Sequence, residues 1–193
     1  MKKIVLCILV LFLFPNFAYT EQYNRNKHFK HWSDLDGNGF NTRKEVLIRH
    51  AAQTYNGVYL VTIVENDVKV GIWVCPYSGK VFHSSSNLDI DHVVPLKYAW
   101  EHGAENWSDK EREVFANDMD NLLAVNRIVH SGKGDSSPDK WLPPNISFHA
   151  EYIAKFISIC DRYKLSYDKE KVNAALKFSR EYARGIRDYE REN

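Results

Sequence analysis

The sequence has few cysteines, and none of them stands in a metal-binding spacing. It contains three, Cys7, Cys75 and Cys160, and no C-x-x-C pair. A structural zinc site built from cysteines is therefore excluded. Cys7 lies in an N-terminal apolar run, which leaves Cys75 and Cys160 for the rest of the chain. In an exported protein they could form a disulfide, or both could be small buried apolar residues, and the sequence leaves both alternatives open.

The chain also lacks an apolar run long enough to span a membrane. Its N-terminal run, 4–14, has about eleven residues, whereas a transmembrane helix needs about 20. Lys2 and Lys3 precede this run, and Pro15 and small residues near position 20 follow it. This is the layout of a secretory signal peptide, predicted here as 1–20. We therefore expect a secreted or periplasmic protein without a membrane anchor after cleavage.

Neither sign of charge dominates. Lysine and arginine number 26 against 25 aspartate and glutamate, a net charge of +1. Removal of Lys2 and Lys3 with the leader leaves 24 against 25, or −1. The chain lacks the basic footprint of a protein that coats DNA, but an enzyme that contacts nucleic acid through a local patch is not excluded.

The expected elements are short strands with peripheral helices. Residues 58–64 and 68–74 are rich in β-branched residues on either side of the turn 65–67, which predicts an antiparallel hairpin. The other expected elements are a strand that ends near residue 94, a strand at 121–125, helices at 42–55, 96–102, 108–118, 146–164 and 168–187, and partly helical structure at 127–140. Together they predict the α+β class and one domain, 21–193.

Polar groups interrupt the apolar segment LDIDHVVPLKYAW at 88–100. Asp89, Asp91 and His92 stand on one short strand, where burial of a charge is costly. Asn121 opens the next strand, and His130 follows in the next predicted helix. A carboxylate and an imidazole are ordinary ligands of a divalent cation, and a neutral histidine can accept a proton near neutral pH.

Six segments share a resemblance with one known family. They are LDIDHVVPLKYAW with GAENW (103–107), FANDMDNLLAV (115–125), KGDSSPDKWLPP (133–144), DLDGNGFNTRKEVL (34–47) and PYSGKVF (76–82). In their order along the chain, over about 32–165, they resemble exported HNH endonucleases related to the C-terminal domain of GmrSD restriction enzymes. The resemblance implies a ββα-metal (HNH or His-Me finger) core, accompanied here by the predicted β-hairpin and peripheral α-helices.

The resemblance also implies roles for four residues. Asp91 corresponds to a metal ligand, His92 to the general base, and Asn121 to the asparagine that holds the strand of the base. His130 stands where relatives usually carry asparagine as the second metal ligand. Mg²⁺ is the expected cation, with Mn²⁺ or Zn²⁺ as alternatives. Because adjacent strand residues point to opposite faces, we expect a strand end or a bulge to re-aim Asp91 or His92.

The implied activity is hydrolysis of DNA phosphodiester bonds with little sequence preference, by a monomer. Arg127, Lys133 and Lys140 are candidates for phosphate contacts, or alternatively solvated surface charges. Asp89 is expected to be a surface carboxylate, with support of the site as the alternative. A preference for RNA is an alternative that the sequence leaves open.

A second candidate metal site lies at 34–45. Asp34, Asp36, Asn38 and Glu45 match positions 1, 3, 5 and 12 of an EF-hand calcium loop, with Gly39 at position 6. The favoured alternative is an Asx-rich turn before a helix that Thr42 caps, with Glu45 completing a capping box. If the loop binds Ca²⁺, the protein could instead be a non-catalytic exported calcium-binding or adhesion module.

Overall fold

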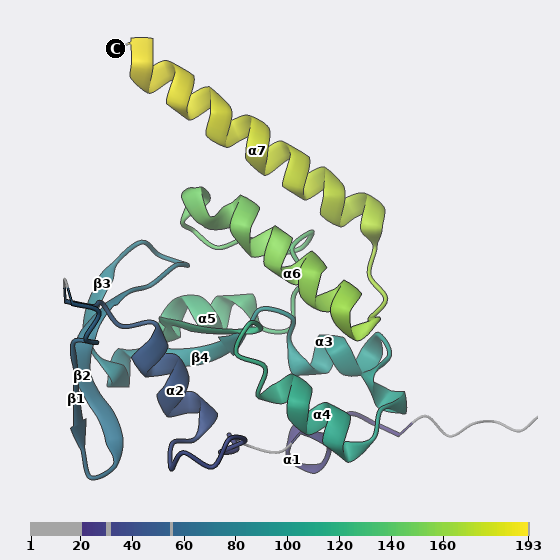
Figure 1. The fold of residues 1–193 in the computed structure, drawn as a ribbon. Coiled ribbons are helices and arrows are strands. Elements are labelled where there is room, and N and C mark those ends of the chain that lie inside the picture. The colour runs from purple at the N-terminus through teal and green to yellow at the C-terminus, as the bar shows by residue number, and fades with distance from the viewer. Residues whose placement is uncertain (1–20, 30–31, 55, 193) are drawn as a thin grey trace, which may run out of the picture.

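The computed structural model describes residues 21–29, 32–54 and 56–192, so the predicted signal peptide, 1–20, lies outside the described residues. The structure contains two small antiparallel sheets and several helices, with the three-stranded sheet at one edge of the molecule (Figure 1), in agreement with the predicted α+β class. The strands are β1 Val61–Val64, β2 Asp67–Val74, β3 Val81–Ser84, β4 Leu88–His92 and β5 Leu122–Asn126. The α-helices are α1 Arg25–His28, α2 Thr42–Arg49, α3 Leu96–Glu101, α4 Asp109–Ala116, α5 Arg127–Lys133, α6 His149–Tyr163 and α7 Lys169–Glu192. Three 3₁₀ turns, η1 Ser85–Asn87, η2 Ala104–Asn106 and η3 Ile146–Phe148, complete the described elements.

The first sheet has the strand order β1-β2-β3 and contains the predicted hairpin. Glu65 and Asn66 connect β1 to β2 with φ angles of 48° and 60°. Two central residues at positive φ are typical of a tight turn whose twist matches that of the flanking strands. The hairpin prediction is confirmed, although regular pairing begins at Val61 instead of residue 58.

The second sheet consists of β4 and β5, and it has buried residues on both faces. Its antiparallel register is regular, with Asp91 opposite Leu123 and His92 opposite Leu122. Directly opposed residues share a face, so Asp91 and Leu123 lie on one face and His92 and Leu122 on the other. Leu123 belongs to one hydrophobic cluster and Leu122 to the second, so the sheet separates the two cores of the molecule.

Helices cover this sheet from both sides. The helix α5 contacts β4 and β5 and begins directly after β5, where the side chain of Asn126 accepts the N–H of Val129 at 3.2 Å and caps it. The helix α2 contacts the same two strands and contributes Val46 and Leu47 to the second cluster. Further out, α6 packs against α7, whose C-terminal half extends past the rest of the molecule in Figure 1.

Some local predictions need correction. The first long helix ends at Arg49, not near residue 55, because the chain turns at His50 toward the first sheet. Its cap is Asn41, whose side chain accepts the N–H of Lys44, while the hydroxyl of Thr42 donates to Ser33 O. By contrast, the helix expected at 108–118 begins where the sequence places it: Ser108 is the N-cap of α4 and forms a reciprocal capping box with Glu111.

The two remaining cysteines are free. Cys75 and Cys160 are fully buried and both belong to the first hydrophobic cluster. Of the two alternatives, small buried apolar residues are therefore observed, without a disulfide between them. No helix in the described part of the chain is both long and apolar enough to cross a bilayer.

Candidate active site

Asp91 and His130 meet beneath α5, near the C-terminal end of β4. Asp91 Oδ1 lies 3.0 Å from His130 Nε2. Because α5 starts directly after β5, its first turn places His130 over the neighbouring strand β4. Lys133 lies three residues further along the same helix face and contacts the same carboxylate. Two of the residues expected at a metal site are thus brought into direct contact.

The carboxylate of Asp91 is buried and has donors on both oxygens. Its second oxygen, Oδ2, accepts the hydroxyl of Tyr77 at 2.5 Å and the ammonium of Lys133 at 2.6 Å. Burial by itself would raise the pKa of Asp91, but the charge of Lys133 and the contact with His130 outweigh it and lower the pKa to about 2. The carboxylate is therefore ionised at neutral pH.

Lys133 does not lie where a substrate phosphate could reach it. Its side chain has no exposed surface, and Nζ donates to Asp91 Oδ2 and to the backbone oxygen of His92. The prediction of a phosphate contact for Lys133 is wrong, because the lysine closes the last turn of α5 over the buried carboxylate. Arg127, with 58% of its side chain exposed, stays a candidate for a phosphate contact.

His92 faces the opposite side of the sheet from Asp91. Its Nε2 lies 2.8 Å from the backbone oxygen of Ala116, the last residue of α4. A carbonyl oxygen can only accept, so Nε2 carries the proton and Nδ1 keeps the lone pair. The ring of Trp32 stacks on the imidazole, with 5.5 Å between centroids and 9° between planes. Burial lowers the pKa of His92 to about 4, so the imidazole is neutral at pH 7.

Asn121 ties the chain that follows His92 to the start of β5. Its Oδ1 accepts the N–H of Val94 at 2.8 Å, and its Nδ2 donates to Val94 O at 3.2 Å. Its backbone oxygen accepts the N–H of Val93 at 2.8 Å. One side-chain amide thus satisfies both polar groups of Val94 inside the protein. This geometry is what the strand-holding role proposed for Asn121 requires.

Asp89 supports His130 from the far side of the imidazole. Its Oδ2 lies 3.1 Å from His130 Nδ1, and its Oδ1 accepts Arg127 Nε at 3.2 Å. The expected role of Asp89 is that of a surface carboxylate. In the structure it instead takes the alternative role, because it lies beside the site and contacts His130. The hydrogen bond to Asp91 is the main cause of the raised pKa of His130, with Asp89 contributing in the same direction.

The donor pair fits a small divalent cation. Neighbouring ligands of an octahedral ion with bonds of 2.0–2.1 Å lie about 2.9 Å apart, close to the 3.0 Å between Asp91 Oδ1 and His130 Nε2. These two atoms are hydrogen-bonded in the structure, so a cation bound by both would replace the proton on Nε2. A carboxylate partner on the other nitrogen is the usual support of a metal-binding histidine, and Asp89 occupies that position. Within the described residues, no group of three or more His, Cys, Asp or Glu side chains could hold a metal ion. Water and substrate would have to complete the coordination.

Asp91 and His92 border one depression of about 70 Å³ even though they lie on opposite faces of the sheet. No bulge interrupts β4, so the expected re-aiming is not needed: His92 is the last residue of the strand, and the depression lies beyond its end. His130, Arg25 and Lys97 also border it, together with Asp135, whose Oδ2 lies 3.4 Å from Lys97 Nζ.

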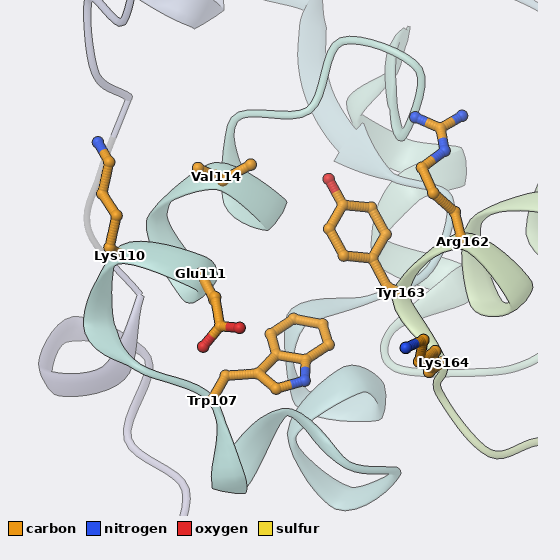
Figure 2. A pocket seen from close by; sticks show the side chains of 7 residues that line it. All are labelled: Trp107, Lys110, Glu111, Val114, Arg162, Tyr163 and Lys164. Carbon is orange, nitrogen blue, oxygen red and sulfur yellow. The ribbon is translucent and has the colours of Figure 1, made fainter.

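A larger pocket, of about 420 Å³, involves different residues. It lies between α4 and the end of α6, where Figure 2 shows the rings of Trp107 and Tyr163 close together. Two of its cations are already engaged: Lys110 pairs with Glu113, and Arg162 pairs with two aspartates. None of its lining residues belongs to the site at Asp91 and His92.

The loop at 34–45 folds around Asp34. The carboxylate of Asp34 accepts the backbone N–H groups of Gly37, Asn38 and Gly39, which lowers its pKa. Asn38 Nδ2 bridges Asp36 Oδ2 at 3.0 Å and Glu45 Oε1 at 2.8 Å. Glu45 is therefore not a capping-box residue, and the Asx-rich turn is observed. Calcium binding by these residues stays a prediction.

Comparison with known proteins shows the family. The chain matches the model of the GmrSD restriction endonucleases, C-terminal domain, over residues 49–175. A protein of Arthroderma benhamiae, described as an uncharacterized secreted protein, is 39% identical over 147 residues, or 75% of this chain and 68% of that protein. No solved structure matches the chain. The chain belongs to the GmrSD C-terminal domain family, which is of nuclease type.

Several residues at the site were missed or misjudged from the sequence. Tyr77 lies in PYSGKVF (76–82), which carries part of the resemblance but was given no role at the site, and Trp32 lies before the first predicted element. The carbonyl of Ala116 carries no side-chain signal at all. For Lys133 the sequence does contain a signal that it lies at the same site as His130, because the three-residue spacing places both on one helix face.

Proposed function

We propose that this protein is a metal-dependent endonuclease that hydrolyses DNA phosphodiester bonds with little sequence preference, using a ββα-metal site. The strands β4 and β5 would be the two strands of that motif, and α5 its helix. The family supports nuclease activity and a nucleic-acid substrate. The similarity to a protein described as secreted agrees with the proposed export.

One observation carries the proposal. A candidate pair of metal ligands, Asp91 Oδ1 and His130 Nε2, lies 3.0 Å apart. Beside this pair stands the neutral His92, whose proton is held on Nε2 so that Nδ1 keeps its lone pair. Asp91 and His92 are consecutive residues, and both border the same depression. An acid–base group and a cation site are therefore available to one bound phosphate.

The proposed reaction uses His92 as the base. Its Nδ1 takes a proton from the attacking water, while the hydrogen bond from Nε2 to Ala116 O orients the ring and stabilises the imidazolium that forms. Trp32 restricts rotation of the ring. A divalent cation held by Asp91 and His130 would supply positive charge to the phosphate oxygens and to the leaving oxygen. The expected products carry 5′-phosphate and 3′-hydroxyl ends.

The test is nicking of supercoiled plasmid by the protein from residue 21 onward. We expect cleavage with Mg²⁺ or Mn²⁺, none with EDTA, and a loss of at least 100-fold in His92→Ala, the range of a removed general base. His83→Ala is the matched control, because His83 is exposed and borders none of the site. Undiminished cleavage by His92→Ala would rule out the assigned mechanism.

The same preparations address the alternatives. Side-by-side digestion of DNA and RNA of equal length identifies the preferred nucleic acid. If no nucleic acid is cleaved and Ca²⁺ raises the melting temperature in a way that Asp34→Ala abolishes, the calcium-binding module replaces the nuclease. If calcium has no such effect, 34–45 is a structural turn.

A further inference from the structure

Lys133 places a buried positive charge at the site where the proposed function needs a metal cation. Its side chain is fully buried, and the side chain of Asp91 is only 4% exposed. The ammonium lies 2.6 Å from Asp91 Oδ2 and also donates to the backbone oxygen of His92. A cation so close to a metal ligand would be expected to repel a second cation.

The two oxygens of Asp91 have separate environments. Oδ2 faces Lys133 and Tyr77, both of which are inside the protein. Oδ1 faces His130, which has 30% of its side chain exposed. Oδ2 is thus held by buried donors, whereas Oδ1 contacts the partly exposed His130 beside the depression, so Asp91 can offer a metal ion one oxygen.

The carboxylates at the site are each paired with a cation before any metal ion enters. Asp135 pairs with Lys97. Lys133 offsets the charge of Asp91, and Arg127 forms an ion pair with Asp89. A buried carboxylate that is already paired needs no metal ion to make folding favourable. It also attracts a divalent ion less than an unpaired carboxylate would.

We propose that Lys133 is a resident cation that neutralises Asp91, so that a divalent metal ion binds tightly only together with the anionic phosphodiester of the substrate. This inference rests on the proposed function. The phosphate supplies the negative charge that Lys133 has cancelled, and by linkage the metal ion tightens substrate binding by the same factor. The protein alone folds with its site assembled and holds the metal ion weakly.

The first experiment measures Mn²⁺ binding without nucleic acid, by calorimetry, in the wild-type protein and in Lys133→Met. Loss of the ammonium leaves Asp91 unpaired, so we expect the variant to bind Mn²⁺ at least tenfold more tightly. Its melting temperature should also fall with EDTA and recover with Mn²⁺, whereas that of the wild type should not respond. Tyr77→Phe is the matched control: it removes a donor from the same oxygen without changing charge, and should alter the affinity less than threefold.

The second experiment keeps the proposal testable if Lys133→Met does not fold. His92→Ala, which leaves the metal ligands in place, is titrated with Mn²⁺ with and without a 12-base-pair DNA duplex, and the duplex alone is the blank. We expect DNA to tighten Mn²⁺ binding at least tenfold.

The outcomes separate this inference from the proposed function. Equal or weaker Mn²⁺ binding by Lys133→Met, or Mn²⁺ binding that DNA does not change, overturns the role of Lys133 and leaves the nuclease standing. If neither protein binds Mn²⁺ with or without DNA, the metal site is wrong and the inference falls with it.

Discussion

At the scale of the residue, adjacent side chains at the end of β4 have opposite environments. Asp91 points toward α5 and is surrounded by donors, so it is ionised. His92 points toward α4 and Trp32, where burial keeps it neutral. The alternation of side chains along a strand produces this separation. A charged ligand and a neutral base can therefore stand next to each other without sharing one environment.

Asn121 is the residue whose replacement should damage this strand end most specifically. In Asn121→Asp the side chain can no longer donate to Val94 O, and a buried carboxylate faces that oxygen. We expect a loss of about 3 kcal/mol in the free energy of unfolding. Urea unfolding at pH 7.5 measures it. Asn106→Asp, at an exposed position, is the control and should stay within about 0.5 kcal/mol of wild type.

At the scale of the element, α4 connects a helix cap to the candidate active site. Its last carbonyls have no partner within the helix, and one of them, Ala116 O, accepts Nε2 of His92. Its first turn is held by Ser108, which accepts the N–H of Glu111. The carbonyl that sets the tautomer of His92 is thus available because the helix ends at that residue.

The cap can be tested separately from the carbonyl. Ser108→Ala removes the side-chain acceptor at the N-terminus of α4, and we expect a loss of about 1 kcal/mol in the free energy of unfolding. The rate of plasmid nicking by the folded variant should stay within twofold of wild type, because the other end of the helix is unchanged. Ser158→Ala, at an exposed position inside α6, is the control. Equal destabilisation by both variants would contradict the assignment of the cap.

At the scale of the whole molecule, the sheet β4-β5 lies between two hydrophobic cores. His50, after α2, accepts the N–H of Ala124 at 3.3 Å, which links one core to this sheet. Burial lowers the pKa of His50, like that of His92, to about 4. Both histidines are neutral in the folded protein and protonate near pH 6.5 when it unfolds.

The expected consequence is a loss of stability on acidification. With a folded pKa below the unfolded pKa, each of these histidines contributes its stabilisation fully above about pH 6.5, and the contribution falls as the pH approaches 4. From pH 7.5 to pH 5 the loss is about 2 kcal/mol for each histidine. His130 acts in the opposite direction, because its contacts with Asp91 and Asp89 raise its pKa.

A comparison of variants isolates one histidine from the others. In His50→Gln the loss of unfolding free energy between pH 7.5 and pH 5 should be about 2 kcal/mol smaller than in wild type. Urea unfolding at the two pH values measures the difference. His83→Gln, which replaces an exposed histidine, should keep the wild-type pH dependence. A wild-type dependence in His50→Gln would show that His50 does not stay neutral in the folded protein.

The sequence by itself determined the local structure and the main polar residues of the candidate site. The hairpin around Glu65 and Asn66, the cap at Ser108 and the α+β class follow from short-range patterns that the chain satisfies locally. Asp91, His92, Asn121 and His130 were singled out because their residue types suit the chemistry and their order resembles one family.

Only the tertiary structure decided how these residues are partnered. The assignment of Lys133 to Asp91, of Asp89 to His130 and of Ala116 O to His92 depends on contacts between segments 24 to 42 positions apart. Such contacts arise from packing of α4 and α5 on the central sheet, and sequence patterns report only which face of an element is apolar. A lysine near a phosphate-binding motif and a lysine buried under a carboxylate look the same in sequence. Burial separates them, because an ammonium removed from water must find an anion inside the protein.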